Sequence, residues 1–150
     1  LSSDGKTVAI GSPRNGVNAE ESGQVRVFEW DKVSNKWNKK GNALQGASAN
    51  DNLGRSVSLS SDGKVVASGS PKRDANGPDS GSVSVFEWNE DSNQWSPKGT
   101  DLDGESADGR LGTSVSLSSD GMVVAIHVLH LLSLPTSTVH LYPISSPGKQ

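Results

Sequence analysis

Four acidic residues between positions 101 and 108 are the side chains of this chain best suited to hold a metal ion. They are Asp101, Asp103, Glu105 and Asp108. The Asp-x-Asp-Gly spacing could present carboxylate oxygens to Ca²⁺, which takes about six to eight oxygen ligands. The matching positions 58 residues earlier, 43, 45, 47 and 50, hold no carboxylate. A solvated loop is therefore the favoured interpretation, with a Ca²⁺ site as the alternative.

The three histidines are the candidates for acid–base chemistry, and they are His127, His130 and His140. No serine or carboxylate forms a recognisable motif around them, and the chain has no cysteine. No glycine-rich phosphate loop, zinc-ligand spacing or nucleophile elbow is present. We therefore expect these histidines to be strand or loop residues. We expect no catalytic residue, no cofactor and no enzyme activity in this segment.

Two pairs of tryptophans could form an aromatic binding surface, for example for carbohydrate. Trp30 and Trp37 are seven residues apart, and Trp88 and Trp95 have the same spacing. Their identical placement in two copies of a repeat favours a role in packing, because aromatic side chains carry the largest buried area in so polar a sequence. We expect these rings to pack between neighbouring repeats.

The elements that position these residues are copies of one repeating unit. Leu1, Leu59 and Leu117 each begin a similar block of the form Leu-Ser-Ser-Asp-Gly, so the repeat length is 58 residues. The first two copies continue in step through Val-x-Val-Phe-Glu-Trp and Ser-Asn-x-Trp. A fixed long period indicates one supersecondary unit copied in tandem, whose apolar faces are buried mainly against its neighbours.

Each unit is predicted to be a four-stranded antiparallel meander. In the second copy, residues 56–60 alternate with period two, 61–64 have tight-turn residues, and 65–69 form a short strand that ends before Pro71. Residues 82–88 carry apolar side chains on both faces, which predicts a strand covered on both sides. Residues 94–98 begin a more polar outer strand.

The fold class is therefore all-β, a partial β-propeller of about two and a half blades. The expected division is a partial first blade at 1–52, a second blade at 53–110, and a third, degenerate blade with a tail at 111–150. A stack of β-sandwich domains is the competing architecture. It requires about 100 residues and seven strands for each domain, which a 58-residue repeat does not supply.

Three motifs of the second copy resemble the FG-GAP repeat, which builds the seven-bladed propeller of integrin α subunits and related surface proteins. They are a Leu-Gly pair at 53–54, Gly-Ser-Pro at 69–71 and Gly-x-Val-x-Val-Phe at 81–86. The resemblance covers about residues 1–126. Many FG-GAP blades carry a calcium loop of alternating aspartates, but the corresponding turn at 60–63 has one acid only. That metal site is therefore not carried over.

The WD-type repeat is the alternative resemblance, because Ser-Ser-Asp-Gly-Lys-x-Val-Ala followed by Val-x-Val-Phe is similar to its strand pair. Its period of about 40–45 residues is shorter than the one found here, and the Trp-Asp pair occurs only at 30–31. Both resemblances imply a propeller.

The third copy departs from the pattern after Ile126. His127 and the apolar residues after it stand where Gly-Ser-Pro is expected, and the pattern returns at 138–142, two residues short of register. We expect a strand there and a frayed tail from Pro143 onward. A decayed repeat, a local frameshift and a cap all fit this sequence.

The composition limits the kinds of partner that this chain is expected to bind. The net charge is −3, the hydrophobic fraction is 31% and the mean hydropathy is −0.51. No basic stripe with interleaved aromatics predicts nucleic-acid binding, and no apolar stretch is long enough to span a bilayer. The chain starts inside a repeat, so we expect it to be part of a longer polypeptide with further propeller blades.

The sequence leaves three functions open. The favoured one is a non-catalytic binding or adhesion module, extracellular or at the cell surface, that presents variable loops to a protein or glycan. The first alternative is an intracellular WD-like interaction scaffold. The second is part of a propeller enzyme whose active site lies in other blades.

Overall fold

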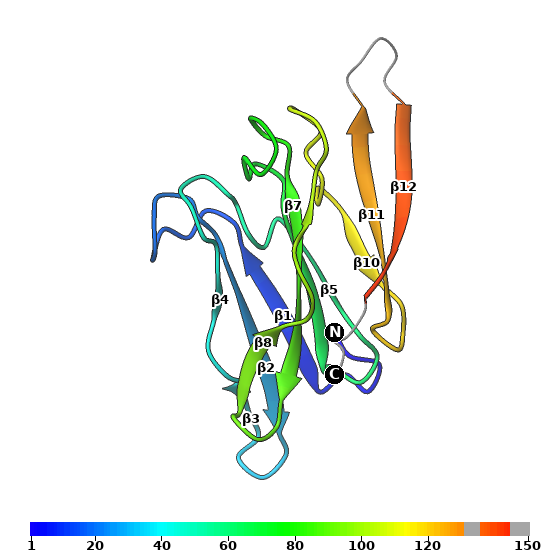
Figure 1. Cartoon of the computed structure of the whole chain (residues 1–150). Helices are drawn as coiled ribbons and strands as arrows, with labels where there is room; N and C mark the ends of the chain where they lie inside the picture. The colour runs from blue at the N-terminus through cyan, green and yellow to red at the C-terminus, as the bar shows by residue number, and fades with distance from the viewer. Residues whose placement is uncertain (131–135, 145–150) are drawn as a thin grey trace.

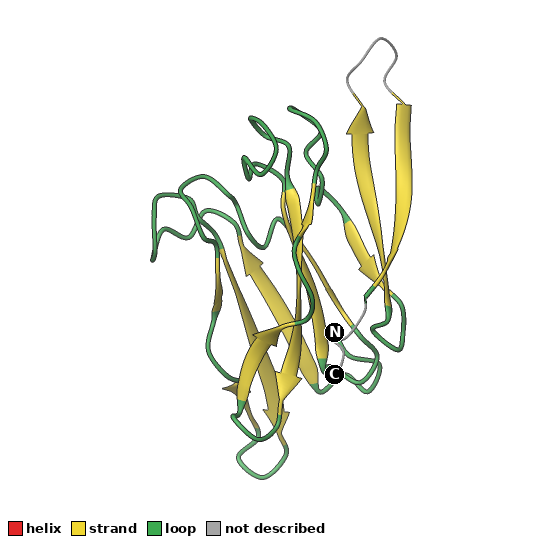
Figure 2. Ribbon diagram, viewed as in Figure 1, coloured by secondary structure: helices red, strands yellow, loops and turns green. Residues whose placement is uncertain are grey.

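The computed structural model describes residues 1–130 and 136–144, and these contain strands and loops but no helix (Figures 1 and 2). The strands form three antiparallel sheets, which follow one another along the chain and which we call blades 1, 2 and 3. Blade 1 contains β1 (Thr7–Ser12), β2 (Gln24–Asp31), β3 (Lys36–Lys39) and β4 (Leu44–Gln45). Blade 2 contains β5 (Ser56–Leu59), β6 (Val65–Ser70), β7 (Ser82–Asn89), β8 (Gln94–Pro97) and β9 (Leu102–Asp103). Blade 3 contains β10 (Val115–Leu117), β11 (Val123–His130) and β12 (Thr136–Pro143).

The all-β fold class is confirmed, and blade 2 is the most complete copy of the repeat. Its strands lie in the order β5-β6-β7-β8, and the short strand β9 pairs with the other half of β7. Sequence analysis did not predict β9. The outer strand is therefore interrupted at residues 98–101, although the Lys98 N–H still donates to the Val85 carbonyl at 2.8 Å.

The Ser-Ser-Asp-Gly turns of all three blades are closed by the same hydrogen bonds. In blade 2 the Ser60 hydroxyl donates to Asp62 Oδ1 at 2.6 Å and accepts from the Val65 N–H at 2.9 Å. Gly63 has a φ of 69°, which favours glycine. The turns also link neighbouring blades, since the Ser61 N–H donates to the Ser119 carbonyl at 2.9 Å. A short polar motif thus sets both the hairpin and the blade spacing.

Two apolar cores lie between the blades and hold them together. The core between blades 1 and 2 contains Val25, Val27, Leu44, Leu53, Val66 and Trp95. The core between blades 2 and 3 contains Val65, Ala67, Val83, Val85, Leu111, Val124, Ile126 and Ile144. Each fully buried valine side chain contributes about 1.5–3 kcal/mol, so these interfaces carry much of the stability. We call the side of a blade that meets the next blade its forward face, and the opposite side its rear face.

A pair of glycines brings the backbones of adjacent blades together. A Cβ at Gly11 would overlap the carbonyl oxygen of Gly54, and a Cβ at Gly69 would overlap that of Gly112. Gly11 and Gly69 are the glycines of Gly-Ser-Pro, while Gly54 and Gly112 belong to the Leu-Gly pairs. The spacing of these two motifs therefore reflects a steric requirement of the interface between blades.

Blade 3 differs from blade 2 beyond Ile126. Strand β11 runs on to His130, and His127 pairs with Val139 as Gly69 pairs with Val83. The strand expected at 138–142 is confirmed by β12, and the shift of two residues is seen in its register. The expected fraying from Pro143 is wrong for the first two residues, because Pro143 ends β12 and the Ile144 N–H donates to the Met122 carbonyl at 2.8 Å. The rest of that expectation, at 145–150, lies outside the described residues.

Candidate functional site

Loops gather at one end of the blades, at the upper edge in Figure 1, and we call this end the loop edge. It contains the β1–β2 loop, the β6–β7 loop and the segments that lead into β5 and β10. Equivalent hydrogen bonds hold both copies: the Leu53 N–H donates to the Ser22 carbonyl, and the Leu111 N–H to the Ser80 carbonyl, both at 3.0 Å. The backbone is thus repeated while the side chains differ, which is an arrangement suited to binding by variable loops.

The acidic residues singled out from the sequence do not converge on one point. Asp101 forms an ion pair with Arg73, while Asp108 has a φ of 59° and its N–H donates to the Pro78 carbonyl at 2.8 Å. Asp103 and Glu105 instead line one pocket. Within residues 1–130 and 136–144, no group of three or more His, Cys, Asp or Glu side chains is placed to hold a metal ion. The Ca²⁺ alternative thus remains a prediction from the sequence alone.

The ion pair with Asp101 fixes the side chain of Arg73 beside the acidic segment. Partial burial acts to lower the pKa of Arg73, but the hydrogen bond and charge of Asp101 outweigh it and raise the pKa above its ordinary value. The negative charge of Asp103 also raises the pKa of Arg73. Arg73 is therefore a fixed cation, and Asp101 is committed to it rather than to a ligand.

A pocket of about 220 Å³ lies between the acidic segment of blade 2 and strand β12 of blade 3. Asp103 and Glu105 line one side, and His140 and Tyr142 line the other. Because β12 is shifted by two residues, His140 pairs with Ile126 and Tyr142 with Val124, both of which belong to the core toward blade 2. The shift thus places a histidine and a tyrosine opposite the acidic segment, and we call this site the His140 pocket.

The two rings of the His140 pocket form one polar, aromatic surface. Their centroids are 6.0 Å apart and their planes make an angle of 17°, so the rings are stacked. The His140 ring nitrogen Nε2 lies 3.2 Å from the Thr138 hydroxyl, and Nδ1 lies 3.5 Å from the Tyr142 hydroxyl. Carboxylates accept hydrogen bonds, and the histidine and tyrosine can donate or accept them. The pocket can therefore bind a small ring with several hydroxyl groups.

His127 takes no part in this pocket. His127 lies on β11 next to Val128, whose side chain lines the pocket, and successive side chains of a strand point to opposite faces. His130 is the last residue of β11. The structure thus brings His140, and not His127, to the acidic segment. The sequence register of residues 138–142 could have revealed the place of His140. The shift of two residues puts His140 at the position that Ser84 occupies in blade 2.

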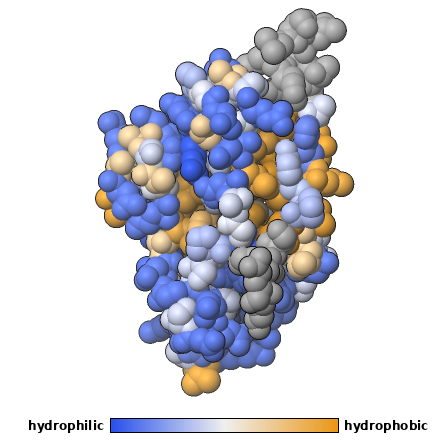
Figure 3. All heavy atoms as spheres, in the orientation of Figure 1, coloured by the Kyte–Doolittle hydropathy of each residue, from blue (hydrophilic) through white to orange (hydrophobic). Residues whose placement is uncertain are grey.

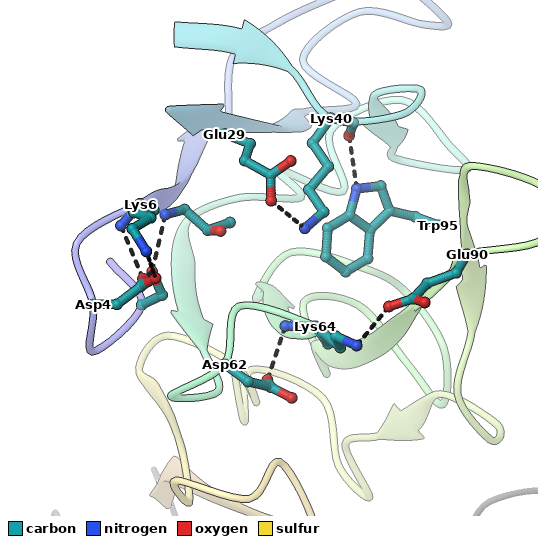
Figure 4. A network of polar contacts seen from close by, with 10 residues as sticks. Asp4, Lys6, Glu29, Lys40, Asp62, Lys64, Glu90 and Trp95 are labelled. Atoms are coloured by element: carbon teal, nitrogen blue, oxygen red, sulfur yellow. Dashed lines mark hydrogen bonds and ion pairs between the residues drawn. The ribbon is translucent and has the colours of Figure 1, made fainter. Parts of the chain in front are cut away.

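The tryptophan pair of blade 2 packs between blades, as the favoured interpretation predicted. Trp95 is 9% exposed, and its ring N–H donates to the Lys40 carbonyl of blade 1 at 2.9 Å (Figure 4). The Lys40 ammonium also lies 5.1 Å from the centre of the Trp88 ring. Trp88 and Trp95 meet edge to face at 5.4 Å. The equivalent Trp37 of blade 1 is 43% exposed, because no described blade covers that side.

These sheets and their packing define a partial β-propeller, and comparison with known proteins agrees. The resemblance to the FG-GAP repeat is confirmed, because the model of that repeat family matches residues 44–86. No curated protein matches the sequence.

Two solved structures share the fold of this chain. The first is the periplasmic gluconolactonase of Pseudomonas aeruginosa, with a TM-score of 0.57 and 17% identity over 95% of this chain and 38% of that one. The second is a candidate 6-phosphogluconolactonase of Bacteroides uniformis, with a TM-score of 0.50 and 17% identity over 96% of this chain and 39% of that one. The chain therefore spans less than two fifths of either structure. At this identity the likeness concerns the fold alone.

The likeness corrects the expectation that the protein is not an enzyme. That expectation came from the absence of a recognisable catalytic motif. Both of these solved structures are described as lactonases, so this is a fold that carries enzymes. The lack of a short catalytic motif therefore does not separate this chain from catalytic propellers.

No helix that could cross a membrane occurs in the part of the chain that the structure describes.

Proposed function

We propose that this chain is a propeller segment that binds a ligand at its loop edge, with the His140 pocket as the binding site and a glycan as the ligand. The observation that carries the proposal is the meeting of Asp103 and Glu105 with the stacked His140 and Tyr142 rings in one pocket. Aromatic rings cover the apolar face of a sugar, while carboxylates accept hydrogen bonds from its hydroxyls.

The size of the pocket favours a glycan over a protein ligand. Its volume of about 220 Å³ is below the range of about 300–1,000 Å³ that is usual for drug-sized ligands. A single sugar ring suits this space better than a folded protein surface, which needs a patch of about 800 Å² on each partner. A protein ligand at the loop edge is the other outcome that the binding experiment can give.

The binding experiment is a glycan array probed with the intact chain, followed by calorimetric titration of the strongest ligand. We expect His140→Ala and Glu105→Gln each to weaken binding at least about tenfold, because the first removes a ring from the pocket lining and the second removes a carboxylate charge. The control is Val139→Thr, which changes the neighbouring residue on the opposite face of β12. Binding that is absent, or that is equally strong in the wild type and all three variants, contradicts the proposed site.

We also propose a location outside the cytoplasm, at the cell surface, in the periplasm or secreted. The FG-GAP match and the periplasmic lactonase support it. Immunolabelling of intact and permeabilised cells tests it. Labelling only after permeabilisation of the outermost membrane would favour a periplasmic or an intracellular, WD-like scaffold over surface adhesion.

Catalysis by the complete propeller is a second candidate function, which the two lactonases support. The His140 pocket is lined by an imidazole and two carboxylates, which are groups that can act in general acid–base catalysis. The test is hydrolysis of glucono-δ-lactone by the full-length protein, followed by acid release at constant pH. A rate equal to that of the uncatalysed reaction would contradict lactone hydrolysis as a function. The proposal that the His140 pocket binds a glycan would not be affected.

We propose, finally, that a further blade of the longer polypeptide covers the rear face of blade 1. On this face Trp37 is 43% exposed, whereas its counterpart Trp95 in blade 2 is 9% exposed because blade 1 covers it. Trp30 and Trp37 repeat on this face the pair with which blade 2 meets blade 1. Acrylamide quenching, with Trp37→Phe to isolate one signal, should find Trp37 accessible in this chain and shielded in the longer polypeptide. Equal quenching in both would contradict the proposal.

A further inference from the structure

A second pocket at the loop edge is surrounded by positive charge, and nothing in the FG-GAP match or the shared fold accounts for it. It has a volume of about 300 Å³. Its polar lining consists of Arg14, Asn52, Arg55, Lys72, Arg110 and Thr113. It shares no lining residue with the His140 pocket. Four cations around one pocket are unexpected in a chain whose net charge is −3.

The repeat builds this cationic pocket from equivalent backbone positions in successive copies. Arg14 and Lys72 occupy the same position, directly after the Gly-Ser-Pro motifs that end β1 and β6. The pocket is completed by the segments that lead into the inner strands β5 and β10. Hydrogen bonds fix these segments: the Asn52 amide donates to the Glu21 carbonyl at 2.9 Å, and the Thr113 hydroxyl to the Arg110 carbonyl at 2.8 Å.

Two of the four cations are partly neutralised and two are not. Arg110 pairs with Asp79 at 3.1 Å, and Arg14 lies 4.0 Å from Glu21. In the part of the chain that the structure describes, no carboxylate lies within 4.0 Å of the charged groups of Arg55 or Lys72. Arg55 and Lys72 therefore give the pocket lining an excess of two unpaired positive charges, which attracts anions, while Asp51, Asp74 and Asp79 line a neighbouring pocket on the other side of Lys72.

We infer that the cationic pocket binds a phosphate group of a small ligand. A phosphate monoester carries a charge of about −1.5 to −2 at neutral pH, which matches the local excess, and it has several acceptor oxygens. The planar guanidinium of Arg55 can donate two parallel hydrogen bonds to such a group, and Lys72 acts as a compact point charge. A monoanionic carboxylate would neutralise only half of this excess.

The inference does not rest on the function proposed for the His140 pocket. The cationic pocket holds no histidine and no tyrosine, so loss of glycan binding in the His140→Ala variant leaves it unchanged. Likewise, substitutions at Arg55 and Lys72 should not alter the binding of a neutral glycan at the His140 pocket. The two sites can therefore be tested separately in the same protein.

The experiment is a titration of the intact chain with inorganic phosphate at constant ionic strength, followed by backbone amide chemical shifts. We expect saturable shifts at Arg55, Lys72 and Thr113, with a dissociation constant of about 1 mM. Acetate at the same concentration should bind at least about tenfold more weakly. Sulfate that binds as well as phosphate would support the site as one for dianions in general, whereas acetate that binds equally well would overturn the assignment.

Variants then locate the site. Arg55→Gln and Lys72→Gln should each weaken phosphate binding about tenfold, while Arg55→Lys, which keeps the charge, should lose less. Lys32→Gln is the matched control, because Lys32 is an exposed lysine next to the end of β2, away from the pocket lining. All these residues are exposed, so the variants should fold normally. Shifts that stay linear to about 20 mM phosphate, or binding that Arg55→Gln and Lys72→Gln leave unchanged, would overturn the inference.

Discussion

Blades 2 and 3 carry the same repeat but differ in what covers them. Val83 in β7 is fully buried against blade 3, whereas its counterpart Val139 in β12 is 66% exposed. Leu141, the counterpart of Val85, is 69% exposed, and Figure 3 shows apolar surface on this side of the molecule. The pattern of apolar residues therefore survives in blade 3, although no described blade covers it.

One residue distinguishes the forward face of blade 3 from that of blade 2. Gly69 leaves room for the Gly112 backbone of the next blade, and a Cβ there would overlap the Gly112 oxygen. His127 occupies the equivalent position in blade 3. Its side chain fills the space that a following Leu-Gly segment would need. A decayed repeat, a local frameshift and a cap all place a side chain at this position, so His127 fits each of them alike.

The largest effect should come from removing the ring that seals the interface between blades 1 and 2. Trp95→Ala should destabilise the chain by about 3–5 kcal/mol, since it leaves a cavity and frees the Lys40 carbonyl. Trp37→Ala, at the uncovered position, should cost about 1 kcal/mol or less. Urea unfolding followed by circular dichroism measures both. If the two variants lost the same free energy of unfolding, the tryptophan pairs of blades 1 and 2 would be either both covered or both uncovered, which would contradict the structure.

Substitutions at Gly69 and at its counterpart His127 should give the next largest difference in the free energy of unfolding. Gly69→Ala should cost at least about 2–3 kcal/mol, because the added methyl group forces the backbones of blades 2 and 3 apart. His127→Ala should change the free energy of unfolding by less than about 0.5 kcal/mol, because no described backbone lies against that position. The same urea unfolding assay applies. A tolerated methyl at Gly69 would remove the steric argument for the Gly-Ser-Pro motif.

Substitutions at Val83 and at its counterpart Val139 should give a somewhat smaller difference in the free energy of unfolding. Val83→Ala removes two buried methyl groups and should cost about 2 kcal/mol, while Val139→Ala should cost less than about 0.5 kcal/mol. Thermal unfolding at matched concentrations measures the difference. If Val139→Ala proves as costly as Val83→Ala, the forward face of blade 3 is covered in solution.

The smallest effect concerns the turn that all three blades share. The N–H of Lys6 and the Ser2 hydroxyl lower the pKa of Asp4 to about 2, and the Ser118 hydroxyl and the Met122 N–H lower the pKa of Asp120. A carboxylate whose pKa is lower in the folded state stabilises the fold above its ordinary pKa of about 3.9. This stability should be lost as the pH falls toward 2.

Carboxyl-carbon NMR titration measures this directly. We expect Asp4 to titrate near pH 2 in the wild type, and Asp4→Asn to flatten part of the pH dependence of stability between about pH 4 and pH 2. Because blade 3 retains this turn, Asp120 should also titrate below its ordinary value. An ordinary titration of Asp4 and Asp120 would show that the turns are not closed by these bonds in solution.

The strands of blade 2 could be predicted from the sequence because local chemistry determines them. Alternation at 56–60, the Ser-Asp-Gly turn and the proline after β6 each indicate a boundary without reference to other blades. The short strand β9 was missed because two residues show no periodicity. The role of Gly69 was missed for a different reason: a glycine in a strand does not reveal which backbone approaches it.

The pockets could be predicted only in part. The acidic segment was identified from the sequence, but its partners His140 and Tyr142 come from another blade and become visible only through the register of β12. The cationic pocket is lined by equivalent positions of two copies, but Arg55 corresponds to Thr113 and Arg110 to Asn52, so neither copy alone reveals the group of cations. Contacts between blades, unlike strands within them, depend on how the sheets pack.

Hydrogen exchange of β7 and β12 in the intact chain tests most directly whether blade 2 is enclosed and blade 3 is open. Strand β7 is paired on both sides, by β6 and by β8 and β9, whereas β12 pairs only with β11 among the described strands. We expect amides at 82–89 to exchange at least about a hundredfold more slowly, on average, than those at 136–143. Equally slow exchange in the two strands would contradict this account, because it would mean that β12 and its exposed Val139 and Leu141 are covered in solution.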